Sequence, residues 1–544
     1  MDGYLKLNYK DFALINYNNN FLFLQFDNSS RYFGLLLPNN DYYMKVIDKI
    51  ENERFKDKKV EEIYLMDENK IKVIYENGEE EYELYNHKLV YRTDKTSRIK
   101  LFLDIRHIYD VDEWGRIYSY DIKDGKVNIY FNKGDINFKL YVSGFNKVYE
   151  NEEKWLKVYY KYDEYRKSPP FERYLYVPFT FEASEIKIIF SDNPEIKYKE
   201  ERLNKEKLIR SRLLSFVKNN KISAGFPWYF QEWTRDVLIS LPAFYLIGKK
   251  DIVKNKLIEY SNYFLSDGRL RNITNQNIGN SDSFGLFVKR LFEFRELFSD
   301  EEFNQLVNII IKNLENFEEN YFDKRYNLFL AYPNETWMDT LVRNYPIELQ
   351  FLMLNVYERL YEYTKDNKYK EKLEKIKLSI KLYYLSDFSL YDDLNTKTIR
   401  CNIFLSYYYY PNVFSKFEWE KIFDYALNHL YLYWGGVSSI SKMDKRFIPE
   451  SNEDNYFNNN GKSMHNGDSW IFINNITAMA LYDVNKDKYQ RYIEKIIEAD
   501  EEYINDIGTL PERSSAIKRS INGAIHQLWS IATYLELFKT INKI

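Results

Sequence analysis

Residues 228–244 read WYFQEWTRDVLISLPAF, and this stretch marks where the chain turns from strand-like to helical patterning. Its first half holds two tryptophans, a tyrosine and the pair Arg235–Asp236, and its second half is almost wholly apolar. An acidic residue just ahead of an apolar run is typical of a helix N-terminus. Indole rings bury a large apolar area and charged groups make strong hydrogen bonds, so the same turn is also suited to holding a ligand.

The whole-chain composition limits the classes of protein to consider. A chain of 544 residues exceeds what one hydrophobic core usually supports, so at least two domains are expected. Its 78 basic and 82 acidic side chains give a net charge of −4, which offers no general attraction for nucleic acid or an anionic membrane. We find no signal-peptide pattern and no long apolar run, and therefore expect a cytoplasmic protein.

Cysteine and histidine usage gives no sign of a metal or other cofactor. The only cysteine, Cys401, cannot form an internal disulfide, and the five histidines show no metal-ligand spacing. No phosphate-binding glycine motif is present either. We therefore expect no cofactor. Tyrosine is abundant, with 52 residues, and its ring and hydroxyl suit a neutral, hydroxyl-rich ligand such as a sugar, although most of these rings must lie in the core.

Residues 1–200 show the short alternating apolar runs of β-strands. Examples are FLFLQF at 21–26 and EIKIIF at 185–190, and Gly, Asn and Asp separate such runs. The pairs Asp124–Gly125 and Lys133–Gly134 fit hairpin turns. This region is predicted to be an N-terminal antiparallel β-sandwich domain.

From about residue 201 to 544 the apolar period becomes that of helices. Twelve helices in this length is the number expected for an (α/α)6 barrel, so we predict a multidomain β + α protein with this barrel as its catalytic domain. The predicted helices span residues 205–219, 233–247, 250–265, 281–298, 300–319, 344–365, 368–387, 400–410, 415–430, 467–483, 486–506 and 520–538.

Four segments that precede helices share an unusual composition. Each combines acids or amides with Trp, Gly or Pro, and each lies before an even-numbered helix of the predicted ring. Alternate helices of one ring would bring these segments to one mouth, as a pocket with aromatic walls and at least two carboxylates. Glycoside hydrolysis requires such a pair of carboxyl groups, one acid and one base. The segments are GFPWYFQEWTRD (225–236), NETWMD (334–339), MHNGDSW (464–470) and GTLPERSS (508–515).

In this order the four segments resemble the archaeal-type glycogen debranching enzymes, the amylo-α-1,6-glucosidase family of the glucoamylase-like clan. The resemblance lies in W-x-R-D, in T-W-M-D, in H-N-G-x-x-W, and in G-x-x-x-E with its final G-x-x-x-Q-x-W-S helix. SRYFGLLL at 30–37 is a weaker match, with Phe33 where the family has His. The resemblance implies a β-sandwich ahead of an (α/α)6 barrel that removes single glucose stubs with inversion.

The same resemblance implies roles for individual residues. Asp339 matches the general acid and Glu512 the general base, and an inverting pair should stand about 6.5 to 9.5 Å apart. Asp339 is alternatively a helix N-cap, Glu512 a capping or salt-bridging residue beside Arg513, and Glu348 a competing acid. The substrate-binding candidates are Trp228, Trp233, Arg235, Asp236, Asp282, Trp337, Glu348, His465 and Asn466.

Each binding candidate also has a plain structural interpretation. Arg235 and Asp236 are expected to hold the hydroxyls of a terminal glucose, but they could instead form an internal ion pair. The tryptophans could be core residues, and a lone histidine such as His465 is usually structural.

Three functions remain open from the sequence. The first is an α-1,6-glucosidase that trims branch stubs of a glycogen-like α-glucan. The second is a glucoamylase-like α-glucosidase that acts on α-1,4 ends or a small disaccharide, and the third is a noncatalytic glucan-binding protein. The expected partner is an α-glucan or oligosaccharide, with no nucleic acid and no membrane, and the sequence leaves the oligomeric state open.

Overall fold

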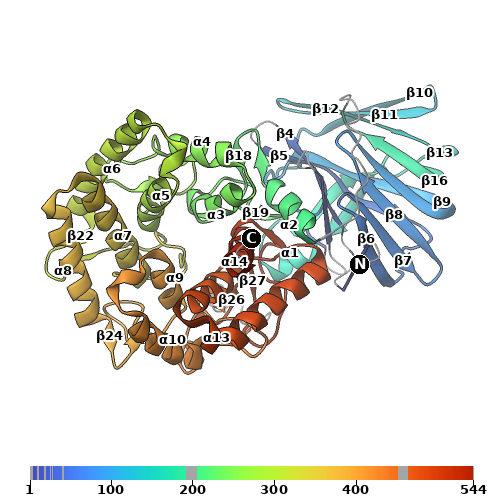
Figure 1. The fold of residues 1–544 in the computed structure, drawn as a ribbon. Helices are drawn as coiled ribbons and strands as arrows, with labels where there is room; N and C mark the ends of the chain where they lie inside the picture. Colours follow the sequence, from blue (N-terminus) through green and yellow to red (C-terminus); the bar gives the residue numbers. More distant parts are fainter. Residues whose placement is uncertain are drawn as a thin grey trace. The chain divides into compact units, whose positions relative to one another are not determined.

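The computed structural model describes residues 4–8, 12–16, 20–24, 26, 29–39, 42–191, 205–450 and 463–542. The chain divides into two compact units (Figure 1). Unit 1 comprises Met1–Lys221 and Glu502–Thr509, and unit 2 comprises Ile222–Glu501 and Leu510–Ile544. The domain boundary predicted at residue 200 lies outside the described residues.

Unit 1 is a large antiparallel β-structure, as the alternating pattern predicted. Its described strands join into one network of sixteen. The strands are β1 (Leu5–Leu7), β2 (Phe12–Ile15), β3 (Phe21–Leu24), β4 (Gly34–Asn39), β5 (Tyr42–Asn52), β6 (Val60–Asp67), β7 (Lys70–Tyr75), β8 (Gly78–Leu84), β9 (Lys88–His107), β10 (Ile117–Lys123), β11 (Lys126–Lys133), β12 (Ile136–Ser143), β13 (Lys147–Glu150), β14 (Trp155–Tyr159), β15 (Glu172–Tyr176) and β16 (Phe179–Ile189). Helices α1 (Lys161–Tyr165) and α2 (Lys205–Leu214) and the short pair β17 (Val217–Lys218) and β18 (Lys221–Ile222) complete this part of the chain.

The 20-residue strand β9 holds the network together. Its first residues pair with β8, its last residues pair with β5, and β16 runs along most of its length. A register shift between Ala183 and Glu185 bends β16 where β9 passes from one set of partners to the other. One long strand therefore belongs to two groups of strands.

The two predicted hairpin turns are present. Lys123 pairs with Lys126, so Asp124 and Gly125 form a two-residue turn between β10 and β11. Both turn residues have positive φ, of 53° and 70°, as the type I′ turn requires. Lys133 and Ile136 close the next hairpin around Gly134 and Asp135, one residue later than the predicted pair Lys133–Gly134, and here Gly134 has the positive φ, of 60°.

Unit 2 is helical, and its helices form a ring in Figure 1. α14 packs against α3, α3 against α5, α5 against α7 and α7 against α9, which gives the inner side of the ring. The helices are α3 (Thr234–Leu246), α4 (Lys250–Tyr260), α5 (Ser281–Glu293), α6 (Asp300–Tyr321), α7 (Ile347–Thr364), α8 (Asn367–Tyr383), α9 (Asn402–Tyr409), α10 (Lys416–Leu430), α12 (Ser463–Asn466), α13 (Ile471–Ile507) and α14 (Leu528–Asn542), with the 3-10 turns η1 (Arg295–Leu297) and η2 (Pro411–Val413).

Inner and outer helices differ in the fraction of their residues that is buried. Eleven of the 13 residues of α3 are buried, against seven of the 22 residues of α6. An inner helix packs on all sides, whereas an outer helix buries only one stripe and keeps a polar face. The outer helices α6 and α10 each begin with a capping box, at Ser299 and Ser415, which fixes their N-termini.

The predicted helices all have a counterpart among the described residues. Two of them, 467–483 and 486–506, are joined in α13, where Asn485 has non-helical φ and ψ of −162° and 86°. The last helix begins at Leu528 and not at 520, because His526 and Gln527 just before it form the short strand β28, which pairs with β19. Among the described residues, the short strand pairs of unit 2 are β19 (Gly225–Phe226) with β28 (His526–Gln527), β20 (Leu270–Arg271) with β21 (Gly279–Asn280), β22 (Phe322–Asp323) with β23 (Leu328–Phe329), β24 (Leu385–Ser386) with β25 (Ser389–Leu390), and β26 (Ser469–Trp470) with β27 (Arg513–Ser514).

None of the helices in the described part of the chain is long and apolar enough to cross a membrane.

Candidate active site

One cavity in unit 2 draws its lining from all four unusual segments. Consecutive helices of the ring run in opposite directions, so the segments ahead of α3, α7, α13 and α14 reach the same end. The sequence prediction of one pocket with aromatic walls and at least two carboxylates is confirmed. The cavity has a volume of about 70 Å³ and is lined by Ala224, Tyr229, Trp233, Arg235, Asp236, Trp337, Asp339, Met464, Trp470, Glu512, Gln527 and Trp529.

Short strand pairs hold these segments together. β19 of the first segment pairs with β28, which leads directly into α14. β26 of the third segment pairs with β27, which follows Glu512. Segments far apart in the chain are thus joined by backbone hydrogen bonds, which limits how far the lining side chains can move apart.

Asp339 lies in a segment that is held on both sides. The Trp337 indole N–H donates to Asn402 Oδ1 at 2.8 Å, and Arg343 Nη2 donates to Thr336 Oγ1 at 2.7 Å. After Asp339, Thr340 Oγ1 and His465 Nδ1 are 2.6 Å apart. α7 begins only at Ile347, with Pro346 as its N-cap, so Asp339 is not the N-cap of that helix.

The surroundings of Asp339 favour its protonated form. Burial is the main cause that raises the pKa of its carboxyl group; Arg235 opposes this effect and Asp282 adds to it. A raised pKa suits a general acid, because that group must carry a proton to give to the leaving oxygen.

The Glu512 carboxylate is fixed by the backbone. Its Oε2 accepts from the Ala524 N–H at 3.0 Å, and the Glu512 N–H donates to the Ala524 carbonyl at 2.8 Å. Gly523 packs directly against this carboxylate: its φ is +72°, and a Cβ there would come within 1.9 Å of Oε2. Only glycine therefore leaves the carboxylate where it lies. The neighbouring Arg513 forms an ion pair with Asp468.

Arg235 and Asp236 occupy the first turn of α3, as predicted, and their side-chain hydrogen bonds go to other residues, which argues against the alternative of an internal Arg235–Asp236 pair. Arg235 Nε donates to Asp282 Oδ2 at 2.8 Å, while Asp236 Oδ1 accepts from Gln527 Nε2 at 3.3 Å. Burial raises the pKa of Asp236 to about 7; Arg235 lowers it, and the negative charge of Glu512 raises it. The cavity lining therefore includes three carboxyl groups and one guanidinium.

Aromatic rings form much of the wall. Trp337 meets Trp470 edge to face with ring centroids 5.4 Å apart, and Trp233 meets Tyr229 in the same way at 6.3 Å. Trp529 stacks on Phe472 at 4.4 Å. Interlocked rings of this kind hold each other in place, so the wall is rigid before any ligand binds.

Five of the predicted binding residues are not among the residues that line this cavity. Trp228 is buried, and Asp282 holds Arg235. Glu348 accepts from Arg343 with both carboxylate oxygens, at 2.5 and 3.0 Å, so it lies in an ion pair with a residue that follows Asp339 in the chain.

His465 and Asn466 contact other side chains of unit 2. The His465 ring stacks on Trp470 with an interplanar angle of 1°, and Asn466 Oδ1 accepts from Arg400 at 2.7 Å. For all five residues, contact with a sugar stays a prediction.

Several lining residues were missing from the predicted set. Trp470, Gln527 and Trp529 belong to the H-N-G-x-x-W and G-x-x-x-Q-x-W-S patterns, so the sequence contained a signal for them. Tyr229 and Met464 also lie in the quoted segments. Ala224 carries no chemical signal and is found only from its position in the fold. Among the described residues, no group of three or more His, Cys, Asp or Glu side chains could hold a metal ion.

Comparison of the whole structure defines the class of fold. A bacterial glucoamylase solved in complex with acarbose is 12% identical, with 99% of this chain and 98% of that chain covered and a TM-score of 0.64. A GH63 mannosylglycerate hydrolase from Thermus thermophilus is 11% identical over 62% of this chain and 100% of its own, with a TM-score of 0.48. The fold is that of the glucoamylase-like proteins, a β-unit followed by an (α/α)6 barrel.

The sequence comparison then gives the family. Residues 207–536 match the amylo-alpha-1,6-glucosidase family, and the chain belongs to this family of glycoside hydrolases. No curated protein matches the chain.

Proposed function

We propose that this protein is an inverting glycoside hydrolase that releases glucose from α-1,6-linked branch stubs of a glycogen-like α-glucan in the cytoplasm. Membership of the amylo-alpha-1,6-glucosidase family supports the reaction class. The observation that carries the proposal is that Asp339 and Glu512 line one small aromatic cavity together with Arg235 and Asp236.

In the proposed reaction Asp339 is the general acid. It gives its proton to the glycosidic oxygen as the bond between that oxygen and the anomeric carbon breaks, and the shortened glucan leaves as an alcohol. Burial raises the pKa of the Asp339 carboxyl group, which favours the protonated form that this step needs. The positive charge that develops on the sugar is met by a pocket that already holds further carboxylates.

Glu512 is the proposed general base. It takes a proton from a water molecule whose oxygen attacks the anomeric carbon from the opposite face, so the released glucose has the inverted, β configuration. The two backbone bonds to Ala524 and the close approach of Gly523 favour this role, because a base must be held in place to direct the water.

Arg235 and Asp236 are proposed to bind hydroxyl groups of the terminal glucose, and the tryptophans to cover its apolar face. One carboxylate oxygen of Asp236 accepts a hydrogen bond from Gln527, and Arg235 donates to Asp282. Both side chains are therefore held in place without substrate. Charged partners give short, directional hydrogen bonds to sugar hydroxyls.

A second candidate is an α-glucosidase that acts on α-1,4 ends or on a small disaccharide. The shared fold with a glucoamylase that was solved with acarbose supports it. The two candidates differ in linkage, and a noncatalytic glucan-binding protein would cleave neither.

The test is the release of glucose from a glucosyl-branched limit dextrin, isomaltose and maltose by the purified chain, with Glu512→Gln as the inactive control. We expect the branched dextrin to be the best substrate and β-glucose to appear first in the NMR spectrum. Faster cleavage of maltose supports the second candidate. α-Glucose as the first product rules out inversion, and equal activity of the Glu512→Gln variant removes Glu512 as the base.

A further inference from the structure

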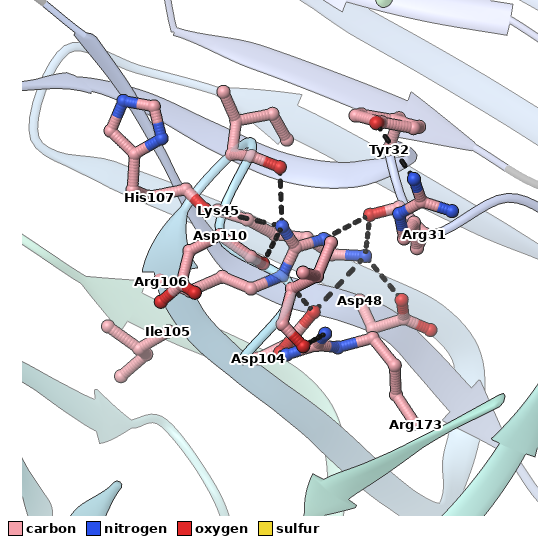
Figure 2. Close-up of polar contacts among 12 residues, drawn as sticks. Arg31, Tyr32, Lys45, Asp48, Asp104, Ile105, Arg106, His107, Asp110 and Arg173 are labelled. Carbon is pink, nitrogen blue, oxygen red and sulfur yellow. Dashed lines mark hydrogen bonds and ion pairs between the residues drawn. The ribbon is translucent and has the colours of Figure 1, made fainter. Parts of the chain in front are cut away.

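Unit 1 contains a cluster of charged side chains that are fully buried (Figure 2). Asp104 lies at its centre, 2.8 Å from Arg106 Nε, 3.4 Å from Arg173 Nη2 and 3.8 Å from Lys45 Nζ. Removing charges from water is costly even when they are paired. The cost of burying these charges indicates that the cluster has a structural role, and its hydrogen bonds show which segment it holds.

The guanidinium groups of this cluster hold the loop between β9 and β10, residues 108–116. Arg106 Nη1 donates to the carbonyls of His107, Ile108 and Asp110, the last at 3.0 Å. Arg173 Nη1 donates to the carbonyl of Val111 at 3.0 Å. Figure 2 shows the Arg106 side chain reaching the backbone at the end of β9. The first half of the loop is thus fixed from inside the unit.

The second half of the loop is fixed by its own acidic side chains. The Asp112 N–H donates to Asp110 Oδ1 at 2.9 Å, and the Trp114 N–H donates to Asp112 Oδ1 at 3.0 Å. Lys133 Nζ contacts Asp110 Oδ2 and the Asp112 carbonyl, both at 2.6 Å. Two consecutive Asp-based turns and the Lys133 contacts therefore hold the backbone of the loop up to Trp114.

A third set of bonds ties the loop to the neighbouring strand β15. Glu113 Oε1 accepts from the Tyr174 N–H at 2.9 Å, and Arg116 Nη1 donates to the Tyr174 carbonyl at 2.8 Å. Arg116 also lies over the Trp155 ring, 4.8 Å from its centroid. The loop and the edge of β15 consequently form one surface.

That surface presents Trp114 to solvent. Its side chain is 86% exposed, the largest value for any large apolar side chain in the described part of the chain. Val111, Ile117 and Tyr174 are 49%, 61% and 47% exposed beside it in the same loop and the strands that flank it. Exposed apolar side chains that are grouped on one loop and the strands bonded to it, and not scattered singly, are typical of an interaction site.

The charges of the surface indicate the kind of ligand. Asp110 is paired with Lys133 at 2.6 Å, and Glu113 with Arg116 at 3.4 Å. Asp112 is the one further acid of the loop, so the charges of the surface nearly cancel and do not favour an anionic ligand. A neutral ligand with an apolar face that can stack on an indole ring fits it best, and a sugar ring has such a face.

We propose that Trp114 and the apolar side chains beside it bind the chain of an α-glucan, as a platform separate from the catalytic cavity. This inference rests on the proposed function. The proposed reaction takes place at a terminal glucose, so most of a polymeric substrate lies outside the catalytic cavity. A second binding site on the same protein raises the effective concentration of chain ends without adding a contact at the catalytic site.

The test measures polymer binding and catalysis separately in the full chain. Native gel electrophoresis with glycogen in the gel gives the affinity for polymer, and glucose release from a short branched oligosaccharide gives the catalytic activity. We expect Trp114→Ala to weaken glycogen binding about tenfold, the loss expected for one stacking ring, and to leave cleavage of the oligosaccharide unchanged. Trp114→Tyr retains a ring and should keep most of the binding.

Ile122→Ala is the matched control, because Ile122 is 55% exposed on β10 and lies outside the loop. It should migrate like the wild type. Retardation of Trp114→Ala equal to that of the wild type, or a wild type that glycogen does not retard, would overturn the platform. Since the gel reports binding without cleavage, a wild type that binds glycogen through Trp114 but releases no glucose would contradict the proposed function and leave the platform standing.

Discussion

Asp104 in unit 1 and Asp236 in unit 2 are both buried aspartates, yet their surroundings move the pKa of the carboxyl group in opposite directions. Burial alone raises both. Around Asp104 the charges of Arg106, Arg173 and Lys45 outweigh burial and hold its pKa well below the usual range. Around Asp236 a single Arg235 is opposed by Glu512 and Asp339, and the pKa is raised to about 7.

The difference separates a carboxylate that is fixed in its charged form from carboxyl groups that can exchange a proton. A carboxylate surrounded by three cations stays ionised at every physiological pH and acts as a fixed link between strands. Carboxyl groups that share one cation compete for it, so some of them hold a proton near neutral pH and can exchange it. The number of cations within reach, and not the depth of burial, distinguishes the two regions.

The largest effect is expected from Asp339→Asn. An amide cannot give a proton to the glycosidic oxygen, so kcat should fall by about 10³-fold while the thermal midpoint stays near that of the wild type. Glucose release from the branched dextrin measures it. Asp387→Asn, at an exposed turn between β24 and β25, is the matched control and should keep full activity. An active Asp339→Asn variant would remove Asp339 as the acid.

Asp104→Asn should act on stability and leave the chemistry intact. The change leaves Arg106, Arg173 and Lys45 without their shared negative charge, and breaking a buried pair in this way costs about 3 kcal/mol. A denaturant titration followed by fluorescence measures the loss, with the exposed Asp121→Asn as control. If both variants unfold at the same denaturant concentration, the cluster does not stabilise unit 1.

Gly523→Ala tests whether the position of the Glu512 carboxylate matters. The added methyl group would displace Oε2, so we expect kcat to fall by about 30-fold, or about 2 kcal/mol of transition-state stabilisation, with KM less affected. Gly248→Ala is the control, since Gly248 also has a positive φ, of 83°, but open space around it. A similar kcat in both variants would mean that Glu512 tolerates displacement.

Asp236 should also make the stability of the fold depend on pH. A group whose pKa is higher in the folded state favours folding below its unfolded pKa, and this advantage is lost as the pH rises to the folded pKa. The unfolding free energy of the wild type should therefore fall relative to Asp236→Asn by about 1.4 kcal/mol per pH unit between about pH 4 and 7. Thermal midpoints across this range measure it, and parallel curves would contradict the raised pKa.

Asp104→Asn is a control for this pH experiment, because folding lowers the pKa of Asp104 and raises that of Asp236. Its pKa is lowered on folding, so its contribution is present above about pH 4 and is lost only as the pH falls further. An Asp104→Asn variant should therefore follow the wild-type slope between about pH 5 and 7, even though it is less stable throughout.

The sequence by itself determined the order of the elements, and it singled out Asp339 and Glu512, both of which line the cavity. Apolar periods of two and about 3.6 residues distinguished the β-region from the helical ring, and the turn at Asp124–Gly125 followed from residues that accept positive φ. Such signals are local, so they can be read without knowing the fold. The shared cavity also followed, because alternate helices of a ring must start at the same end.

Only the tertiary structure decided which side chains are partners. Arg235 bonds Asp282, 47 positions away, and not its neighbour Asp236. Glu348 and His465 support the Asp339 segment from other parts of the ring, and Asp104 gathers cations from β5, β9 and β15. Which residues become partners depends on distances between residues far apart in the chain and on how many charges are buried together. Neither quantity is set by spacing in the sequence.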